Sequence, residues 1–178
     1  MLILGIDPGN TKSGWVLWQP GVRVHASAKD DGGAMWNERL LNACRTSPSL
    51  KNIDLIVIER MVIYQASQDT IHDTIVFYGR LLEIFSQRGA DVVLVKRSDV
   101  RSHFKIPGGK GSVDAKVIAA VKRCVGEPGT KQAPGPTYGV AGHSWQALGA
   151  AVTGYRLAID GAVVVLTMVF IGSLVSTI

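Results

Sequence analysis

Two acidic side chains stand at the ends of two strongly hydrophobic runs of the chain. Asp7 closes LILGID, directly before a Pro-Gly-Asn turn, and Glu59 closes IDLIVIE. If the two runs are neighbouring strands, the carboxylates meet at one edge of the sheet, where they repel each other unless a cation is shared between them. Sites rich in oxygen ligands suit Mg²⁺ or Mn²⁺. Taken singly, Asp7 is most simply a turn cap and Glu59 half of an ordinary ion pair; together they favour a metal site.

The elements that must position these acids follow from the pattern of apolar residues. Short β-branched runs separated by Pro-Gly turns predict an antiparallel meander at the start of the chain. Later runs that are apolar throughout predict strands covered on both faces. Apolar residues at helical spacing predict helices in the segments between the strands. The expected fold is therefore α/β with a mixed sheet. Strands are expected over residues 2–7, 13–18, 22–26, 53–59 and 90–96, and helices over residues 34–44, 67–88, 98–104, 113–125 and 141–159.

Length and cysteine content bound the class of protein. A chain of 178 residues is most simply one domain with a sizeable core. The two cysteines, Cys44 and Cys124, have no His or Cys neighbours at metal-ligand spacing. Reduced thiols and a cytoplasmic location are therefore expected. The first residues enter a strand-like pattern without a basic segment, so no secretory signal is expected.

Most of the positive charge lies in one segment. The net charge is +5, and residues 96–131 carry nine Lys and Arg against three Asp and Glu. A stretch of this kind is most simply a solvated surface. It is also the electrostatic footprint of a protein that lies along phosphates, so it favours a nucleic-acid partner modestly.

The end of the chain differs from the rest in composition. Residues 161–178 contain no charged side chain, and this length is about the minimum that spans a bilayer. Strand-forming residues and two glycines speak against a membrane helix. A membrane anchor, a buried or self-associating tail and a foreign extension all stay open. We therefore divide the chain into a domain of residues 1–160 and an apolar tail of residues 161–178 with no assigned role.

Three motifs in order resemble the RuvC family of Holliday-junction resolvases, especially its shorter bacteriophage members, within the RNase H-like superfamily. They are GIDPGNTKSGW, IDLIVIE and GHSWQALGAAVTGY, and the likeness runs from Leu2 to about Tyr155. The first motif alone also fits actin-like ATPases, which begin with a similar strand and turn. The resemblance implies an RNase H-like mixed five-stranded sheet, with the first three strands antiparallel and helices on both faces.

The resemblance also implies a phosphodiester hydrolase that uses two Mg²⁺ or Mn²⁺ ions per site. Asp7 would bridge both ions, Glu59 would hold one, and His143 would be a ligand or general base. Gln146 stands where many relatives have a second acid, on the same helix face as His143. An amide oxygen brings no negative charge, so the second ion should bind more weakly. Asp160 does not substitute, because fourteen helical residues, about 21 Å, separate it from Gln146.

The family acts on branched DNA as a homodimer, for which the helix over residues 67–88 is a candidate interface. Tyr64 is either a core residue or a platform that stacks on an unpaired base. The function expected is structure-selective cleavage of Holliday junctions or other branched DNA. A catalytically weakened DNA-binding protein of the same fold is the alternative, and an actin-like ATPase fragment is a more remote one. The candidate phosphate contacts are Arg97, Arg101, Lys105, Lys110 and Lys116.

Overall fold

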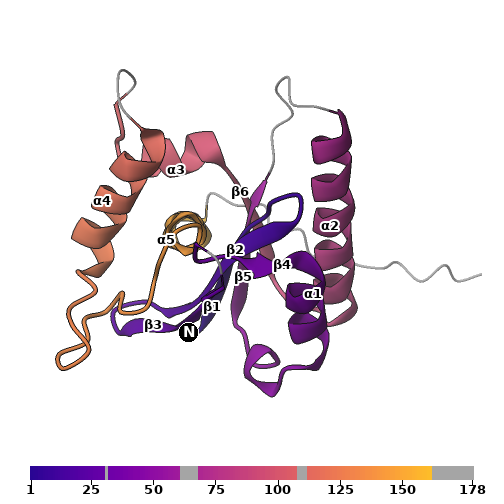
Figure 1. The fold of residues 1–178 in the computed structure, drawn as a ribbon, viewed down its shortest axis with the longest axis horizontal. Coiled ribbons are helices and arrows are strands. Elements are labelled where there is room, and N and C mark those ends of the chain that lie inside the picture. Colours follow the sequence, from indigo (N-terminus) through magenta and orange to yellow (C-terminus); the bar gives the residue numbers. More distant parts are fainter. Residues whose placement is uncertain (31, 61–67, 108–111, 162–178) are drawn as a thin grey trace, which may run out of the picture.

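A computed structural model describes residues 1–30, 32–60, 68–107 and 112–161, with only the backbone of residues 68–70. Figure 1 shows the arrangement of the elements. Three predictions lie outside the described residues: those on Tyr64, on Lys110 and on the tail beyond residue 161. The strands are β1 (Ile3–Asp7), β2 (Lys12–Gln19), β3 (Arg23–Ser27), β4 (Met35–Trp36), β5 (Leu55–Arg60) and β6 (Val92–Lys96). The helices are α1 (Asn37–Thr46), η1 (Pro48–Leu50), α2 (Gln68–Gln87), α3 (Arg97–His103), α4 (Val113–Val125) and α5 (Ser144–Ile159).

The main sheet has the strand order β3-β2-β1-β5-β6. The first three strands are antiparallel to one another, whereas β5 runs parallel to β1 and β6 runs parallel to β5. This confirms the predicted mixed five-stranded sheet. The two-residue strand β4 adds a short pairing to the start of β2.

Helices cover both faces of this sheet, as predicted. Figure 1 shows α1 and α2 on one side and α3, α4 and α5 on the other. Side chains alternate along β1, so that Leu4 and Ile6 join the core beneath α1 and α2, and Ile3 joins the core beneath α5. Two hydrophobic cores, one on each face, therefore hold the sheet in place.

Two helices begin three residues later than predicted. The helix expected from residue 34 begins at Asn37, because Met35 and Trp36 pair with β2 instead. The last helix begins at Ser144 rather than at residue 141. Before it, Gly142 has a φ of +45°, and a Cβ atom there would collide with the carbonyl of Gly32. The chain thus enters α5 through a tight turn that only glycine permits.

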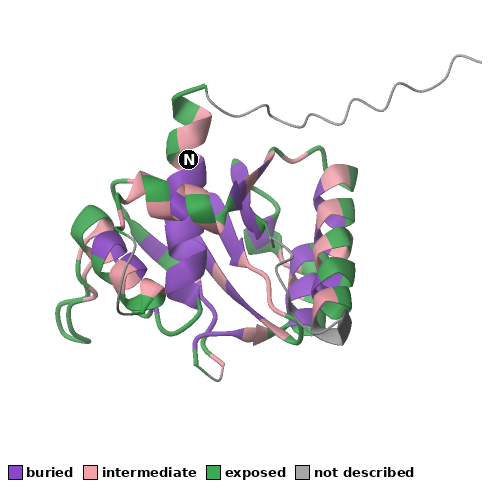
Figure 2. Cartoon of the chain, turned by 90° about the horizontal axis from the view of Figure 1, so that it is seen from above, coloured by how far each residue is buried: buried purple, intermediate pink, exposed green. Residues whose placement is uncertain are grey.

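Helix α5 packs directly on the sheet. Its residues from Ser144 to Gly154 are all buried, which Figure 2 shows as a continuous purple helix. A Cβ atom at Gly5 would lie 2.4 Å from the carbonyl oxygen of Ala147, and one at Gly154 would lie 2.5 Å from a methyl carbon of Val57. Small residues on both sides therefore bring α5 onto β1 and β5. No helix in the described part of the chain is long and apolar enough to cross a membrane.

Candidate active site at the carboxyl edge of the sheet

The two predicted acids lie on neighbouring strands and face the same helix. The register pairs Ile3 with Leu55 and Gly5 with Val57, and side chains two residues apart share a face. Asp7 and Glu59 continue this series by one step, on the face that α5 covers. The Asp7 side chain is 19% exposed and that of Glu59 is 11% exposed. The sheet therefore brings two largely buried carboxyl groups together, as the sequence predicted.

Asn37, the first residue of α1, holds the turn that follows Asp7. The side-chain amide of Asn37 donates hydrogen bonds to the carbonyls of Gly9 (2.9 Å) and Asn10 (3.1 Å). The hydroxyl of Ser13 donates to Oδ1 of Asn37 (2.7 Å) and accepts from the amide of Gly9 (3.2 Å). Both polar side chains are buried. This network, which the sequence analysis missed, holds the Asp7 end of β1 in one conformation.

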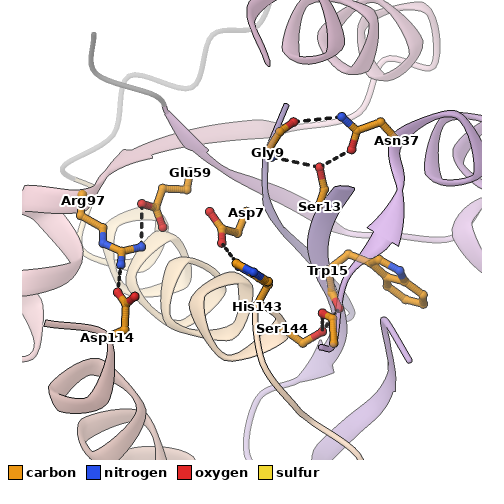
Figure 3. A network of polar contacts seen from close by, with 11 residues as sticks. Asp7, Gly9, Ser13, Trp15, Asn37, Glu59, Arg97, Asp114, His143 and Ser144 are labelled. Atoms are coloured by element: carbon orange, nitrogen blue, oxygen red, sulfur yellow. Dashed lines mark hydrogen bonds and ion pairs between the residues drawn. The ribbon is translucent and has the colours of Figure 1, made fainter. Parts of the chain in front are cut away.

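The start of α5 is tied to β2 and to the loop before β4. The hydroxyl of Ser144 donates to the carbonyl of Gly33 at 2.8 Å and contacts the carbonyl of Trp15 at 3.2 Å. Next to it, a Cβ atom at Gly14 would lie 2.3 Å from the carbonyl oxygen of His143. Nδ1 of His143 is placed 4.0 Å from Oδ2 of Asp7. In Figure 3, Asp7 lies between Glu59 and His143.

Gln146 belongs to the same site. It lines a hollow of about 470 Å³ together with Asp7, the turn that follows it, and His143. Only 6% of the residue is exposed, and its side-chain amide makes no hydrogen bond to any described residue. His143 directly precedes the first residue of α5 instead of lying within the helix. His143 and Gln146 nevertheless line the same hollow, as predicted. The Gln146 amide thus faces the hollow without a protein partner.

Arg97 is placed among the acids instead of on an open surface. Nη1 of Arg97 donates to Oε1 of Glu59 at 3.2 Å, and Nη2 donates to the carboxylate of Asp114, in the first turn of α4. Figure 3 shows the guanidinium bridging the two. Asp114 also lines the hollow. Asp114 was not predicted from the sequence, because an acid in the first turn of a helix is common and nothing in the residues around Asp114 marks it as part of a site.

The protonation of the two acids reflects this crowding. Burial, followed by repulsion from Glu59, raises the pKa of Asp7 to about 8. Burial also raises the pKa of Glu59, although the Arg97 guanidinium opposes that change. Without a further cation, the ionised forms of the two acids are therefore disfavoured together.

The donor atoms suit a hard divalent cation. The Asp7 carboxylate, the Gln146 amide and the His143 imidazole line one hollow, and the Glu59 carboxylate lies close to Asp7 at the same sheet edge. This is a ligand set of the kind that Mg²⁺ and Mn²⁺ accept. Within the described residues, however, no three His, Cys, Asp or Glu side chains already enclose a metal position. Arg97 supplies the positive charge next to Glu59 that a cation would otherwise provide. The site fits a metal ion in chemistry, provided that its side chains adjust around it.

The other predicted DNA contacts lie on α3, after it and on α4. Arg101 is half-buried in α3, Lys105 is exposed just beyond it, and Lys116 is half-buried in the first part of α4. A further cation lines the hollow: Lys12, whose Nζ lies 4.4 Å from the ring centroid of Trp36. Trp36 is 49% exposed. Neither residue was predicted from the sequence, although an exposed tryptophan beside a basic residue is typical of nucleic-acid binding.

A mixed sheet of this order, with acids at the ends of two neighbouring parallel strands and a helix terminus facing them, is the RuvC-like form of the RNase H-like fold. No protein-family model matches the chain, and no curated protein matches it. Two solved structures of RuvC from Thermus thermophilus share the fold, one of them a complex with a Holliday junction substrate. Each is 18% identical, and the match covers 90% of this chain and 97% of the other, with TM-scores of 0.62 for the complex and 0.59. The resemblance stated from the motifs is confirmed at the level of the fold.

Proposed function

We propose that this protein is a structure-selective endonuclease that resolves four-way or otherwise branched DNA. The observation that carries the proposal is the pairing of Asp7 and Glu59 at one sheet edge, with His143 and Gln146 lining the same hollow as Asp7. The RuvC-like fold supports it, since one of the similar structures holds a Holliday junction substrate.

The chemistry follows from the ligand set. Two Mg²⁺ or Mn²⁺ ions bound here would activate a water molecule and stabilise the leaving oxygen of the scissile phosphate. Asp7, which lies between Glu59 and His143 in Figure 3, would be the ligand shared by both ions. His143 is 68% exposed at its side chain, so its imidazole can take up the proton of the attacking water or act as a ligand. The network around Asn37 keeps Asp7 in place while the DNA backbone approaches.

DNA would approach along α3, the segment after it and α4, which carry the candidate phosphate contacts. Arg101, Lys105 and Lys116 remain candidates for phosphate contacts, and Lys12 with Trp36 adds a charged and aromatic rim at the hollow itself. Phosphate contacts position a substrate without reading its sequence, which suits an enzyme that recognises branch shape. Tyr64 and Lys110 stay predictions from the sequence.

A second copy of the chain is part of the proposal, because a junction has two strands to cut symmetrically. The predicted interface, α2, carries two half-exposed apolar side chains, Ile75 and Val76. An apolar surface on a helix is typical of an interface between subunits. We therefore propose a homodimer formed through α2.

One observation favours a second candidate, a branched-DNA-binding protein with weak or no catalysis. Gln146 brings no charge to the second metal position, and Arg97 already neutralises Glu59 in part. Both features lower the affinity of the site for divalent cations.

Cleavage of synthetic substrates separates the two candidates. A labelled four-way junction, the matching linear duplex and its single strands are incubated with the protein and Mg²⁺ or Mn²⁺. A resolvase nicks the junction far faster than the linear forms. Binding of the junction without any nick under either metal would instead favour the second candidate.

A further inference from the structure

We propose that Asp114 is a carboxylate ligand of the metal site, taking the part that an acid at position 146 would otherwise play. The inference rests on the proposed nuclease function, but it concerns metal binding and is tested there. It assigns to α4 a residue of the active site that the motifs on β1, β5 and α5 do not contain.

The position of Asp114 is the first support. Its carboxylate lines the hollow that Asp7 and His143 also line, and it lines the adjoining hollow with Lys12, His143 and Gln146. It also shares the Arg97 guanidinium with Glu59. Because one guanidinium reaches the carboxylates of both Glu59 and Asp114, the two groups are close enough to bind one hydrated divalent ion.

The state of Gln146 is the second, independent support. The residue is 6% exposed, lines both hollows that Asp114 lines, and its amide makes no hydrogen bond to any described residue. Because this amide lines both hollows and has no protein partner, it is free to bind a ligand or water there. A cation held on one side by Asp7 and Glu59 and on the other by Asp114 would meet this amide oxygen.

Charge explains why the acid is needed. With glutamine at position 146, Asp7 and Glu59 alone provide two negative charges, and Arg97 cancels one of them. Asp114 restores the second charge, and its side chain is 58% exposed, so it can turn from the guanidinium to an incoming ion at little cost in desolvation. Arg97 then acts as a stand-in cation that holds the acids together until a metal binds.

The experiment measures Mn²⁺ binding by titration calorimetry on the full chain, without DNA. We expect Asp114→Asn to weaken Mn²⁺ binding about tenfold or more, the scale seen when groups supporting a metal site are lost. The matched control is Glu127→Gln, which removes the same charge from an exposed surface ion pair with Lys122, and it should bind as the wild type does. Gln146→Asp added to Asp114→Asn should restore the affinity. Circular dichroism confirms that each variant is folded.

A double-mutant cycle separates a ligand from a residue that only positions Arg97. In an Arg97→Gln background, Asp114→Asn should still weaken Mn²⁺ binding; no change there would overturn the proposal. Equal Mn²⁺ affinity of wild type and Asp114→Asn would also overturn it, while junction cleavage by the wild type would leave the proposed function intact. Conversely, the wild type could bind Mn²⁺ tightly through Asp114 and yet never nick a junction. That result would contradict the nuclease function and leave the role of Asp114 in metal binding intact. If the wild type binds no Mn²⁺, both are wrong.

Discussion

Nη1 of Arg97 lies 3.2 Å from Oε1 of Glu59, so a cation of the chain itself occupies the edge of the proposed metal site. Arg97 is the first residue of α3, and Glu59 is next to last in β5. The pair therefore joins the end of one central strand to the helix that follows its neighbour. It explains how two buried acids are tolerated side by side in the absence of a metal ion.

Replacing this arginine should make stability depend on metal. In Arg97→Gln, Glu59 loses its charged partner, and we expect the free energy of unfolding without metal to fall by about 1–2 kcal/mol. Saturating Mn²⁺ should recover the loss, because the ion takes over the compensation of charge. Urea denaturation in EDTA and in Mn²⁺ measures both values. Arg39→Gln, which breaks an exposed ion pair with Asp30, should show no difference between EDTA and Mn²⁺.

Restoring an acid at position 146 should strengthen metal binding. Gln146→Asp adds a carboxylate to a buried position of the hollow, so we expect Mn²⁺ affinity to rise about tenfold and cleavage at low Mn²⁺ to become faster. Without metal, the same variant should be less stable, since a third acid joins Asp7 and Glu59. Gln146→Asn is the neutral control. Calorimetry measures the Mn²⁺ affinity and thermal unfolding measures the stability. Equal values for Gln146→Asp and Gln146→Asn would contradict the placement of position 146 at the metal site.

The raised pKa of Asp7 predicts how stability and metal affinity vary with pH. Its pKa rises from the ordinary 3.8 to about 8 in the folded protein, so folding takes up a proton between these values. The contribution of Asp7 to the stability of the metal-free protein should be fully present below about pH 4 and should be lost as the pH rises through 8. Mg²⁺ binding should strengthen over the same range, because the ion displaces that proton.

Asp7→Asn provides the control for this pH dependence, since asparagine does not titrate. Its stability in EDTA should vary less with pH than that of the wild type, as urea midpoints from pH 5 to 9 would reveal. A wild-type protein whose stability rises steadily from pH 5 to 8 would be at odds with the burial of an uncompensated Asp7.

The position of His143 should depend on the absence of a side chain at Gly14. A Cβ atom there would lie 2.3 Å from the carbonyl oxygen of His143, so Gly14→Ala must push the start of α5 away from Asp7. We expect kcat on a junction to drop about a hundredfold with little change in DNA affinity. Gly21→Ala is the control, because nothing lies within 4 Å of the added methyl group in the turn between β2 and β3, and the strain at its φ of +73° does not reach the start of α5. Equal cleavage rates of the two variants would show that His143 need not be held where it is.

The sequence predicted the sheet and the acid pair well, because both depend on local patterns. Two hydrophobic runs that each end in an acid imply strands, and their parallel register brings Asp7 and Glu59 to one edge. Asp114 and the Asn37 network could not be predicted in this way. Each is placed by contacts between residues distant in the chain, and only the packing of α4 and α1 around the sheet brings them to the site. The start of α5 was missed for a related reason, since the close approach of Gly142 to Gly32 is a tertiary constraint.

The role proposed for Asp7 is to hold catalytic metal ions for the cleavage of branched DNA. Its most direct test compares wild type and Asp7→Asn on one labelled four-way junction, in Mn²⁺ and in EDTA, with binding measured in parallel. We predict nicks by the wild type in Mn²⁺ only, and junction binding without nicks by Asp7→Asn. Nicks by Asp7→Asn at the wild-type rate, or by the wild type in EDTA, would contradict the claim.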